Sequence, residues 1–181
     1  MRVISGRLKG RKLKSFKADH IRPTTDRVKE TLFNILAADL PGARVLDLFS
    51  GTGNLAIEAY SRGANYVEAV EAHRLSIKII RENLELLGLQ KEIKVTSQDV
   101  FKFLKSFKDQ PFDLIFVDPP FTEKWAHLCM EEISKSRVCR PGGVVIIEAS
   151  SQERIDDQYN SFKLLDRRKF GDKSASIFRN E

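Results

Sequence analysis

The chain of 181 residues is 41% hydrophobic and 31% charged, which is typical of a soluble globular domain long enough to bury a full core. No apolar run is long enough to cross a membrane, and the basic residues after Met1 lack the apolar stretch of a signal peptide, so we expect a cytoplasmic protein. Cys129, Cys139 and the three histidines lack the spacing of metal ligands, so we expect reduced thiols and no bound metal.

The net charge of +6 is concentrated at the start of the chain. Residues 1–31 contain ten Lys and Arg with three acidic residues, so this segment carries +7 and the remainder −1. A basic segment on a near-neutral body indicates a polyanionic partner, and a solubilising tail is the alternative. The residues that we expect to contact nucleic acid are Arg7, Lys9, Arg11, Lys12, Lys14, Arg22, Thr24 and Arg27.

Residues 2–16 have the pattern of a short hairpin, with Gly6 and Gly10 at turn or bulge positions. Pro23, two threonines and Asp26 then signal the start of a helix, which Pro41-Gly42 ends. An apolar stripe at helical spacing supports this helix; it consists of Val28, Leu32, Phe33, Ile35 and Leu36. We expect a domain boundary before Ala43, which separates a basic extension of residues 1–42 from residues 43–181.

From residue 44 onward, short apolar strands alternate with helices. This alternation predicts an α/β fold, a mostly parallel, doubly wound sheet with helices on both faces. A Gly171-Asp172 turn predicts that the chain closes with an antiparallel hairpin. The seven expected strands are 44–49, 66–71, 93–96, 112–117, 144–148, 162–170 and 174–178, and the expected helices are 54–62, 73–87, 100–107 and 124–138, with a turn at 141–143.

A glycine-rich loop, residues 50–54, joins the first strand of this sheet to a helix. Its glycines allow a ligand to approach the backbone, and the helix start offers N–H donors. The spacing of Gly51, Gly53 and Ala56 also satisfies the dinucleotide fingerprint, with Glu71 placed to bind a ribose. An NAD-dependent oxidoreductase is therefore one interpretation, and Glu71 as a solvated strand end is another.

Acidic residues at successive strand ends favour a cationic cofactor over a dinucleotide. Asp47 would repel a pyrophosphate but attract a cationic amino-acid group, and Asp99 could accept from an adenine amine or simply cap the next helix. Together with Glu71 they fit S-adenosylmethionine better than NAD. The residues expected to contact this cofactor are Asp47, Phe49, Ser50, Gly51, Thr52, Gly53, Asn54, Glu71, Ala72, Asp99, Val100 and Asp118.

The tetrapeptide Asp118-Pro119-Pro120-Phe121 closes a buried strand at the edge where open α/β sheets bind ligands. The prolines lack N–H donors, so the turn offers carbonyl acceptors beside the carboxylate. Phe121 could stack on a base, or could instead be a core aromatic. We expect these four residues to form a catalytic site that holds a nucleobase amine.

The segments 2–6, 9–13, 22–34, 46–53 and 116–121 resemble the RsmD family of bacterial 16S rRNA guanine-N2 methyltransferases. The resemblance implies a Rossmann-like class I methyltransferase fold in residues 43–181 and an RNA-binding extension in residues 1–42. It further implies that S-adenosylmethionine methylates the exocyclic amine of guanine 966, in 16S rRNA or in an assembling small subunit. We expect a monomer.

Two alternatives remain beside this interpretation. An adenine-N6 or DNA amino-methyltransferase would use the same logic in its tetrapeptide. A non-catalytic RNA-binding assembly factor could keep the cofactor fold without turnover, although the intact Asp118, Glu71 and glycine loop argue against it.

Overall fold

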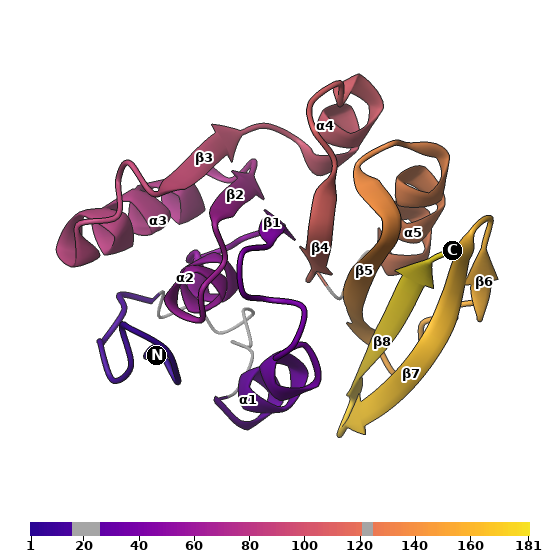
Figure 1. Ribbon diagram of the computed structural model, residues 1–181, viewed down its shortest axis with the longest axis horizontal. Helices are drawn as coiled ribbons and strands as arrows, with labels where there is room; N and C mark the ends of the chain where they lie inside the picture. Colours follow the sequence, from indigo (N-terminus) through magenta and orange to yellow (C-terminus); the bar gives the residue numbers. More distant parts are fainter. Residues whose placement is uncertain (16–25, 121–124) are drawn as a thin grey trace.

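The computed structural model describes residues 1–15, 26–120 and 125–181, which are built around one eight-stranded sheet (Figure 1). The strand order is β3-β2-β1-β4-β5-β8-β7-β6; β1 to β5 are parallel, and β6, β7 and β8 are antiparallel. This arrangement confirms the predicted Rossmann-like α/β class with its C-terminal hairpin. The strands are β1 (Arg44–Leu48), β2 (Tyr66–Glu71), β3 (Ile93–Ser97), β4 (Phe112–Val117), β5 (Cys139–Ser150), β6 (Gln158–Tyr159), β7 (Phe162–Phe170) and β8 (Lys173–Asn180).

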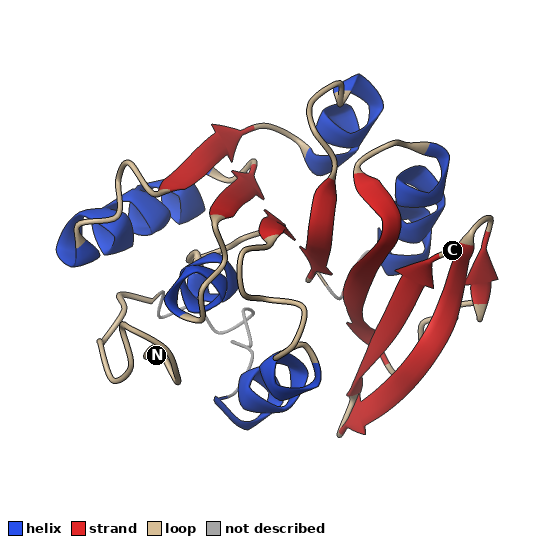
Figure 2. Ribbon diagram, viewed as in Figure 1, coloured by secondary structure: helices blue, strands red, loops and turns tan. Residues whose placement is uncertain are grey.

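Helices cover both faces of the sheet, as the alternation predicted (Figure 2). One apolar cluster packs α1, α2 and α3 against one face, and a second packs α4 and α5 against the other. The helices are α1 (Asp26–Ile35), α2 (Asn54–Ser61), α3 (Arg74–Leu87), α4 (Val100–Ser106) and α5 (Trp125–Lys135). None of the helices in the described ranges combines the length and apolarity that a membrane span requires.

Three expectations about these elements were wrong. The sheet has eight strands and not seven, because the two-residue strand β6 pairs with β7 at its edge. The expected turn at 141–143 lies within β5 as an irregularity, since the partners of β4 jump from Cys139 to Val144. Ile35, placed in the apolar stripe, is exposed, whereas the other four members of the stripe are buried.

Residues 1–15, here called the basic arm, form the predicted hairpin around a single antiparallel bridge between Arg2 and Lys12. Gly6 and Gly10 both adopt positive φ, as their turn positions required. Gly6 also lies against α2 so closely that a Cβ would stand 1.9 Å from the carbonyl oxygen of Ser61. The arm thus docks backbone to backbone on α2, while the division of the chain before Ala43 stays a prediction.

Both cysteines are buried free thiols, Cys129 on α5 and Cys139 at the start of β5. Burial raises the pKa of Cys129 far above its ordinary value and raises the pKa of Cys139 to about 12. These thiols therefore remain protonated at neutral pH and act as small apolar side chains.

Candidate active site

Three carboxylates meet where the adjacent strands β2, β1 and β4 end. Asp47 is the next-to-last residue of β1, Glu71 is the last residue of β2, and Asp118 directly follows β4. The carboxyl edge of a parallel sheet is where ligands bind in such folds. The negative charges of Asp118 and Glu71 both act on Asp47, so the structure brings these three expected cofactor contacts together.

Asp47 is the most unusual of the three, because its carboxylate is buried. Its Oδ2 accepts hydrogen bonds from Ser50 Oγ at 2.6 Å and from Ala56 N at 3.1 Å. Its Oδ1 is buried too, and no residue that the structure describes donates to it. Burial raises the pKa of Asp47 to about 7, the bonds from Ser50 and Ala56 oppose this, and the neighbouring carboxylates add to it. A cation placed against Oδ1 would satisfy this acceptor.

The glycine loop after β1 turns back sharply. Phe49 has φ 59°, in the left-handed region where a non-glycine residue costs about 1 kcal/mol or more, and Gly51 and Gly53 also have positive φ. The turn is closed by hydrogen bonds from Ser50 N to Val70 O at 3.1 Å and from Gly53 N to Ser50 O at 2.8 Å. Strain held in this way indicates that the surrounding structure fixes the loop for a ligand.

Glu71 is not the solvated strand end that one interpretation allowed, since its residue is only 9% exposed. Its carboxylate accepts from three backbone N–H groups: Gly51 at 2.8 Å, Ala72 at 2.9 Å and His73 at 2.8 Å. A carboxylate has about four lone-pair sites, so it retains capacity to accept from a ligand hydroxyl. Glu71 therefore ties the glycine loop to β2 at the place expected for a ribose.

Asp99 caps a helix, which was the plainer of its two interpretations. Its Oδ1 accepts from Lys102 N at 2.9 Å at the start of α4, and the residue is exposed beside the end of β3. Val100 is buried in the core of that face, whereas Ala72 is exposed at the strand end. A contact of Asp99 with an adenine amine stays a prediction.

Asp118, the first residue of the tetrapeptide expected to be catalytic, directly follows β4. Asp118 is half-buried, and its backbone N–H lies 3.4 Å from Leu48 O on β1. Pro119 is buried and Pro120 exposed, while Phe121 lies outside the described residues. The structure thus brings Asp118 to the end of β1, where the loop that holds Phe49 begins.

Two aromatic residues that were not predicted from the sequence, Phe101 and Trp125, lie near the predicted Phe49. The ring centroid of Trp125 lies 6.0 Å from that of Phe49 and 6.0 Å from that of Phe101. The rings of Trp125 and Phe101 meet edge to face, with an angle of 87° between their planes. All three residues are partly buried. The signal was available, because Trp125 is the one tryptophan of the chain and comes four residues after Phe121.

The expected nucleic-acid contacts divide into two groups. Arg7 stacks on the ring of Tyr60 at 3.9 Å and donates to its carbonyl, and Lys14 pairs with Glu82 at 3.0 Å, so both contact the body of the protein. Arg22 and Thr24 lie outside the described residues. The second group is Lys9, Arg11, Lys12 and Arg27, and all six of these described residues, Arg7 and Lys14 included, are exposed.

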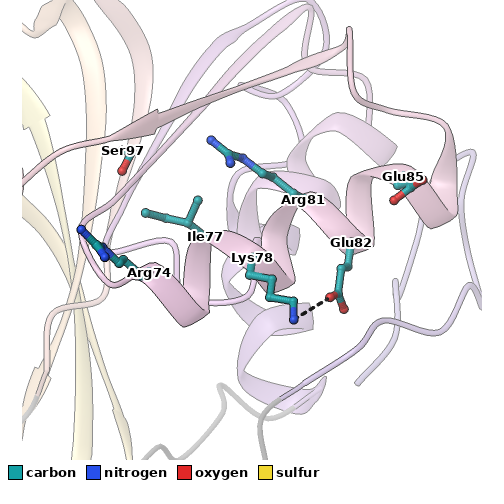
Figure 3. Close-up of a pocket in the computed structure, with 7 residues that line it drawn as sticks. All are labelled: Arg74, Ile77, Lys78, Arg81, Glu82, Glu85 and Ser97. Atoms are coloured by element: carbon teal, nitrogen blue, oxygen red, sulfur yellow. Dashed lines mark ion pairs between the residues drawn. The ribbon is translucent and has the colours of Figure 1, made fainter.

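A groove of about 450 Å³ runs along α3 (Figure 3), and Asp47, Glu71 and Asp118 are not among the residues that line it. No predicted site residue lines it. Lys78 and Glu82 form an ion pair across one turn of α3 at 3.9 Å. The residues that line the groove are Arg74, Ile77, Lys78, Arg81, Glu82, Glu85 and Ser97.

Known proteins resemble this chain over its full length. The family described as Conserved hypothetical protein 95 matches residues 1–179. Ribosomal RNA small subunit methyltransferase D of Haemophilus influenzae is 33% identical, over 99% of this chain and 94% of that protein. The protein named putative rRNA methyltransferase YlbH of Bacillus subtilis is 32% identical, over 99% of this chain and 98% of that protein. The solved structure of yhhF from Escherichia coli is 30% identical, with a TM-score of 0.89 over 100% of this chain and 98% of that one.

Proposed function

Because the chain belongs to the RsmD family, described as Conserved hypothetical protein 95, we propose that it methylates small-subunit ribosomal RNA with S-adenosylmethionine as donor. The relative from Haemophilus influenzae, 33% identical over nearly the whole chain, carries that activity in its name. The target within the RNA is the exocyclic N2 amine of a guanine, at position 966 of 16S rRNA.

The observation that carries this proposal is the carboxylate cluster with the unsatisfied Oδ1 of Asp47. S-adenosylmethionine has a sulfonium and an ammonium group, so acidic surroundings suit it, whereas they would repel the pyrophosphate of NAD. Asp47 and the glycine loop would hold its amino-acid part, and Glu71 its ribose hydroxyls. When bound, the cofactor supplies an electrophilic methyl group.

The chain's own residues supply positioning for the acceptor. A guanine amine is a poor nucleophile because its lone pair is delocalised into the ring. Asp118 and the Pro119 carbonyl would accept hydrogen bonds from the two N–H groups of this amine and draw its nitrogen toward tetrahedral geometry. The lone pair then points at the methyl group, and such orientation supplies much of the acceleration. Asp118 also offers an acceptor for the proton that the methylated amine releases.

RNA binding belongs to the basic arm in this proposal. Lys9, Arg11 and Lys12 are exposed there, and their charges suit phosphates. A guanine within a structured RNA must leave its stack to reach Asp118, at a cost of a few kcal/mol. Phe121, as the last residue of the tetrapeptide, is the proposed stacking partner for the extruded base.

The test is transfer of a labelled methyl group to 16S rRNA and to small subunits that lack the modification, followed by nucleoside analysis. N2-methylguanosine at position 966 is the expected product. N6-methyladenosine would instead favour the alternative amino-methyltransferase. A protein whose melting temperature rises with S-adenosylhomocysteine but that transfers no methyl group would be an assembly factor, and stabilisation by NAD alone would refute the cofactor assignment.

A further inference from the structure

The buried side chain of Asn83 on α3 forms hydrogen bonds to both the basic arm and the glycine loop. Asn83 Oδ1 accepts from the backbone N–H of Lys14 at 2.7 Å, and its Nδ2 donates to Lys14 O at 3.1 Å. The same Nδ2 donates to Thr52 O in the glycine loop at 3.0 Å. Asn83 is completely buried, so water does not replace these bonds. One amide therefore holds the arm on one side and the loop on the other.

A second buried side chain makes a parallel connection from another helix. Lys29 on α1 donates through Nζ to Arg2 O in the arm at 2.7 Å and to Asn54 Oδ1 at 2.7 Å. Asn54 is the residue at which the glycine loop becomes α2. Thr52 and Asn54 flank Gly53, so the two connections hold the loop on both sides of this glycine.

The arm contributes backbone groups to both connections: the carbonyl of Arg2 and the N–H and carbonyl of Lys14. Its basic side chains are therefore not needed for the link to the loop. Without the docked arm, Asn83 would lose its bonds to the Lys14 backbone and Lys29 would lose one of its three acceptors, the carbonyl of Arg2. The same segment can thus serve RNA through its side chains and the cofactor through its backbone.

We propose that Asn83 and Lys29 are positioning residues that make the affinity of the glycine loop for the cofactor depend on the docked arm. This inference rests on the proposed function, because it takes the glycine loop as the S-adenosylmethionine site. It assigns the arm a part in cofactor binding in addition to its part in RNA binding.

The test compares Asn83→Ala with a matched control, Asn180→Ala. Asn180 Nδ2 donates to Cys139 O at 3.0 Å and to Arg140 O at 3.1 Å, and its Oδ1 accepts from Ser161 Oγ at 2.6 Å, so its amide makes as many hydrogen bonds as that of Asn83 but contacts neither the arm nor the glycine loop. Asn83→Ala should raise the Kd for S-adenosylhomocysteine and the KM for S-adenosylmethionine about five- to tenfold, with kcat at saturating cofactor within about twofold. Asn180→Ala should leave both cofactor constants within about twofold.

A measurement on the unaltered protein keeps the proposal testable if Asn83→Ala fails to fold. Linkage is reciprocal, so saturating S-adenosylhomocysteine should slow hydrogen exchange at the Lys14 amide, which donates to Asn83. The proposal is overturned if that exchange is unchanged, or if Asn83→Ala and Asn180→Ala alter cofactor affinity equally. Unaltered protein that does not bind S-adenosylhomocysteine at all would refute the proposed function itself.

Discussion

Lys29 Nζ lies 3.0 Å from Glu58 Oε2, and both side chains are completely shielded from solvent. Burial lowers the pKa of Lys29, but three oxygen acceptors within 3.0 Å keep its ammonium group satisfied. Glu58 accepts in addition from Ile4 N at 2.9 Å, Ser5 N at 3.0 Å and Arg62 Nε at 2.8 Å. This pair therefore connects α1, α2 and the basic arm in one network.

Replacing Lys29 by methionine should lower the free energy of unfolding by about 3–5 kcal/mol, because it leaves the Glu58 charge buried without its principal cation. Urea denaturation measures this loss. Lys135→Met is the matched control, since Lys135 forms an exposed pair with Glu131 at 3.9 Å on α5 and should cost less than about 1 kcal/mol. Equal losses in the two variants would show that the buried pair is no more important than a surface pair.

Asp118→Ala should reduce kcat by about 10²–10³-fold, because an oriented acceptor acts mainly in the transition state. Affinity for S-adenosylhomocysteine should stay within a few-fold. Single-turnover methyl transfer measures the first and calorimetry the second. Asp113→Ala is the control on the same strand, where Asp113 accepts from Arg44 N at 2.7 Å at the opposite end of β4. If the Asp118→Ala variant kept half of the normal activity, the assignment of Asp118 as a catalytic residue would be wrong.

Glu71→Gln should weaken binding of S-adenosylhomocysteine by about 1.5–3 kcal/mol, since ribose hydroxyls and the Gly51 N–H would lose a charged acceptor. RNA affinity measured without cofactor should not change. Glu68→Gln provides the comparison, because Glu68 lies on the same strand but accepts from Thr96 and Tyr66 away from the loop. Calorimetry that finds equal affinities for Glu71→Gln and the unaltered protein would contradict the ribose assignment.

The raised pKa of Asp47 predicts a pH dependence of cofactor binding. A cationic ligand favours the ionised carboxylate, so affinity should rise as pH increases through about 7 and binding near pH 6.5 should release a proton. Calorimetry in buffers of different ionisation enthalpy detects that proton. Asp47→Asn should bind more weakly and lose this part of the pH dependence, and an unaltered pH profile in the variant would count against the prediction.

The same pKa sets the sign of a stability effect in the cofactor-free protein. The folded-state pKa of about 7 lies above the ordinary value of 3.8, so the stability contribution of Asp47 is present below pH 3.8 and is lost as pH rises through 7. Asp47→Asn should therefore gain stability relative to the unaltered protein between pH 4 and pH 8. Thermal unfolding across that range measures the difference.

The sequence predicted the sheet well because parallel strands buried on both faces appear as continuous apolar runs. The glycine loop and the acids at 47, 71 and 118 were predictable for a related reason: strand ends fix where side chains meet. The length of β5 could not be predicted, because Pro141 and the two glycines after it have the composition of a turn. In the structure the strand continues through them with an irregularity in its pairing with β4.

The buried network around Lys29 could not be predicted, because a lysine in a helix is usually exposed. Its partners Arg2, in the arm, and Glu58, on α2, are far away in the chain and reach it only through the tertiary fold. Asp99 shows the converse limit. A carboxylate before a helix serves equally as a cap or as a ligand contact, and the sequence does not distinguish these uses.

Neutralising Lys9, Arg11 and Lys12 to glutamine should weaken RNA binding and flatten its salt dependence, since each lost phosphate contact lowers the log–log slope by roughly 0.7–0.9. Turnover at saturating RNA should survive. Filter binding across salt concentrations measures both effects. A variant with Lys102, Lys105 and Lys108 replaced in the same way controls for net charge, because these residues are also exposed. Equal salt slopes in the two variants would reduce the arm's charges to a solubilising role.

The depth of the two thiols makes the molecule convenient for site-specific labelling. Maleimides and similar reagents attack thiolates, and neither Cys129 nor Cys139 presents one to solvent at neutral pH. A single cysteine placed at an exposed arm position such as Lys12 would therefore take a fluorophore or spin label alone, with the natural cysteines left in place. Such a label would report directly, in solution, whether the arm stays docked on α2.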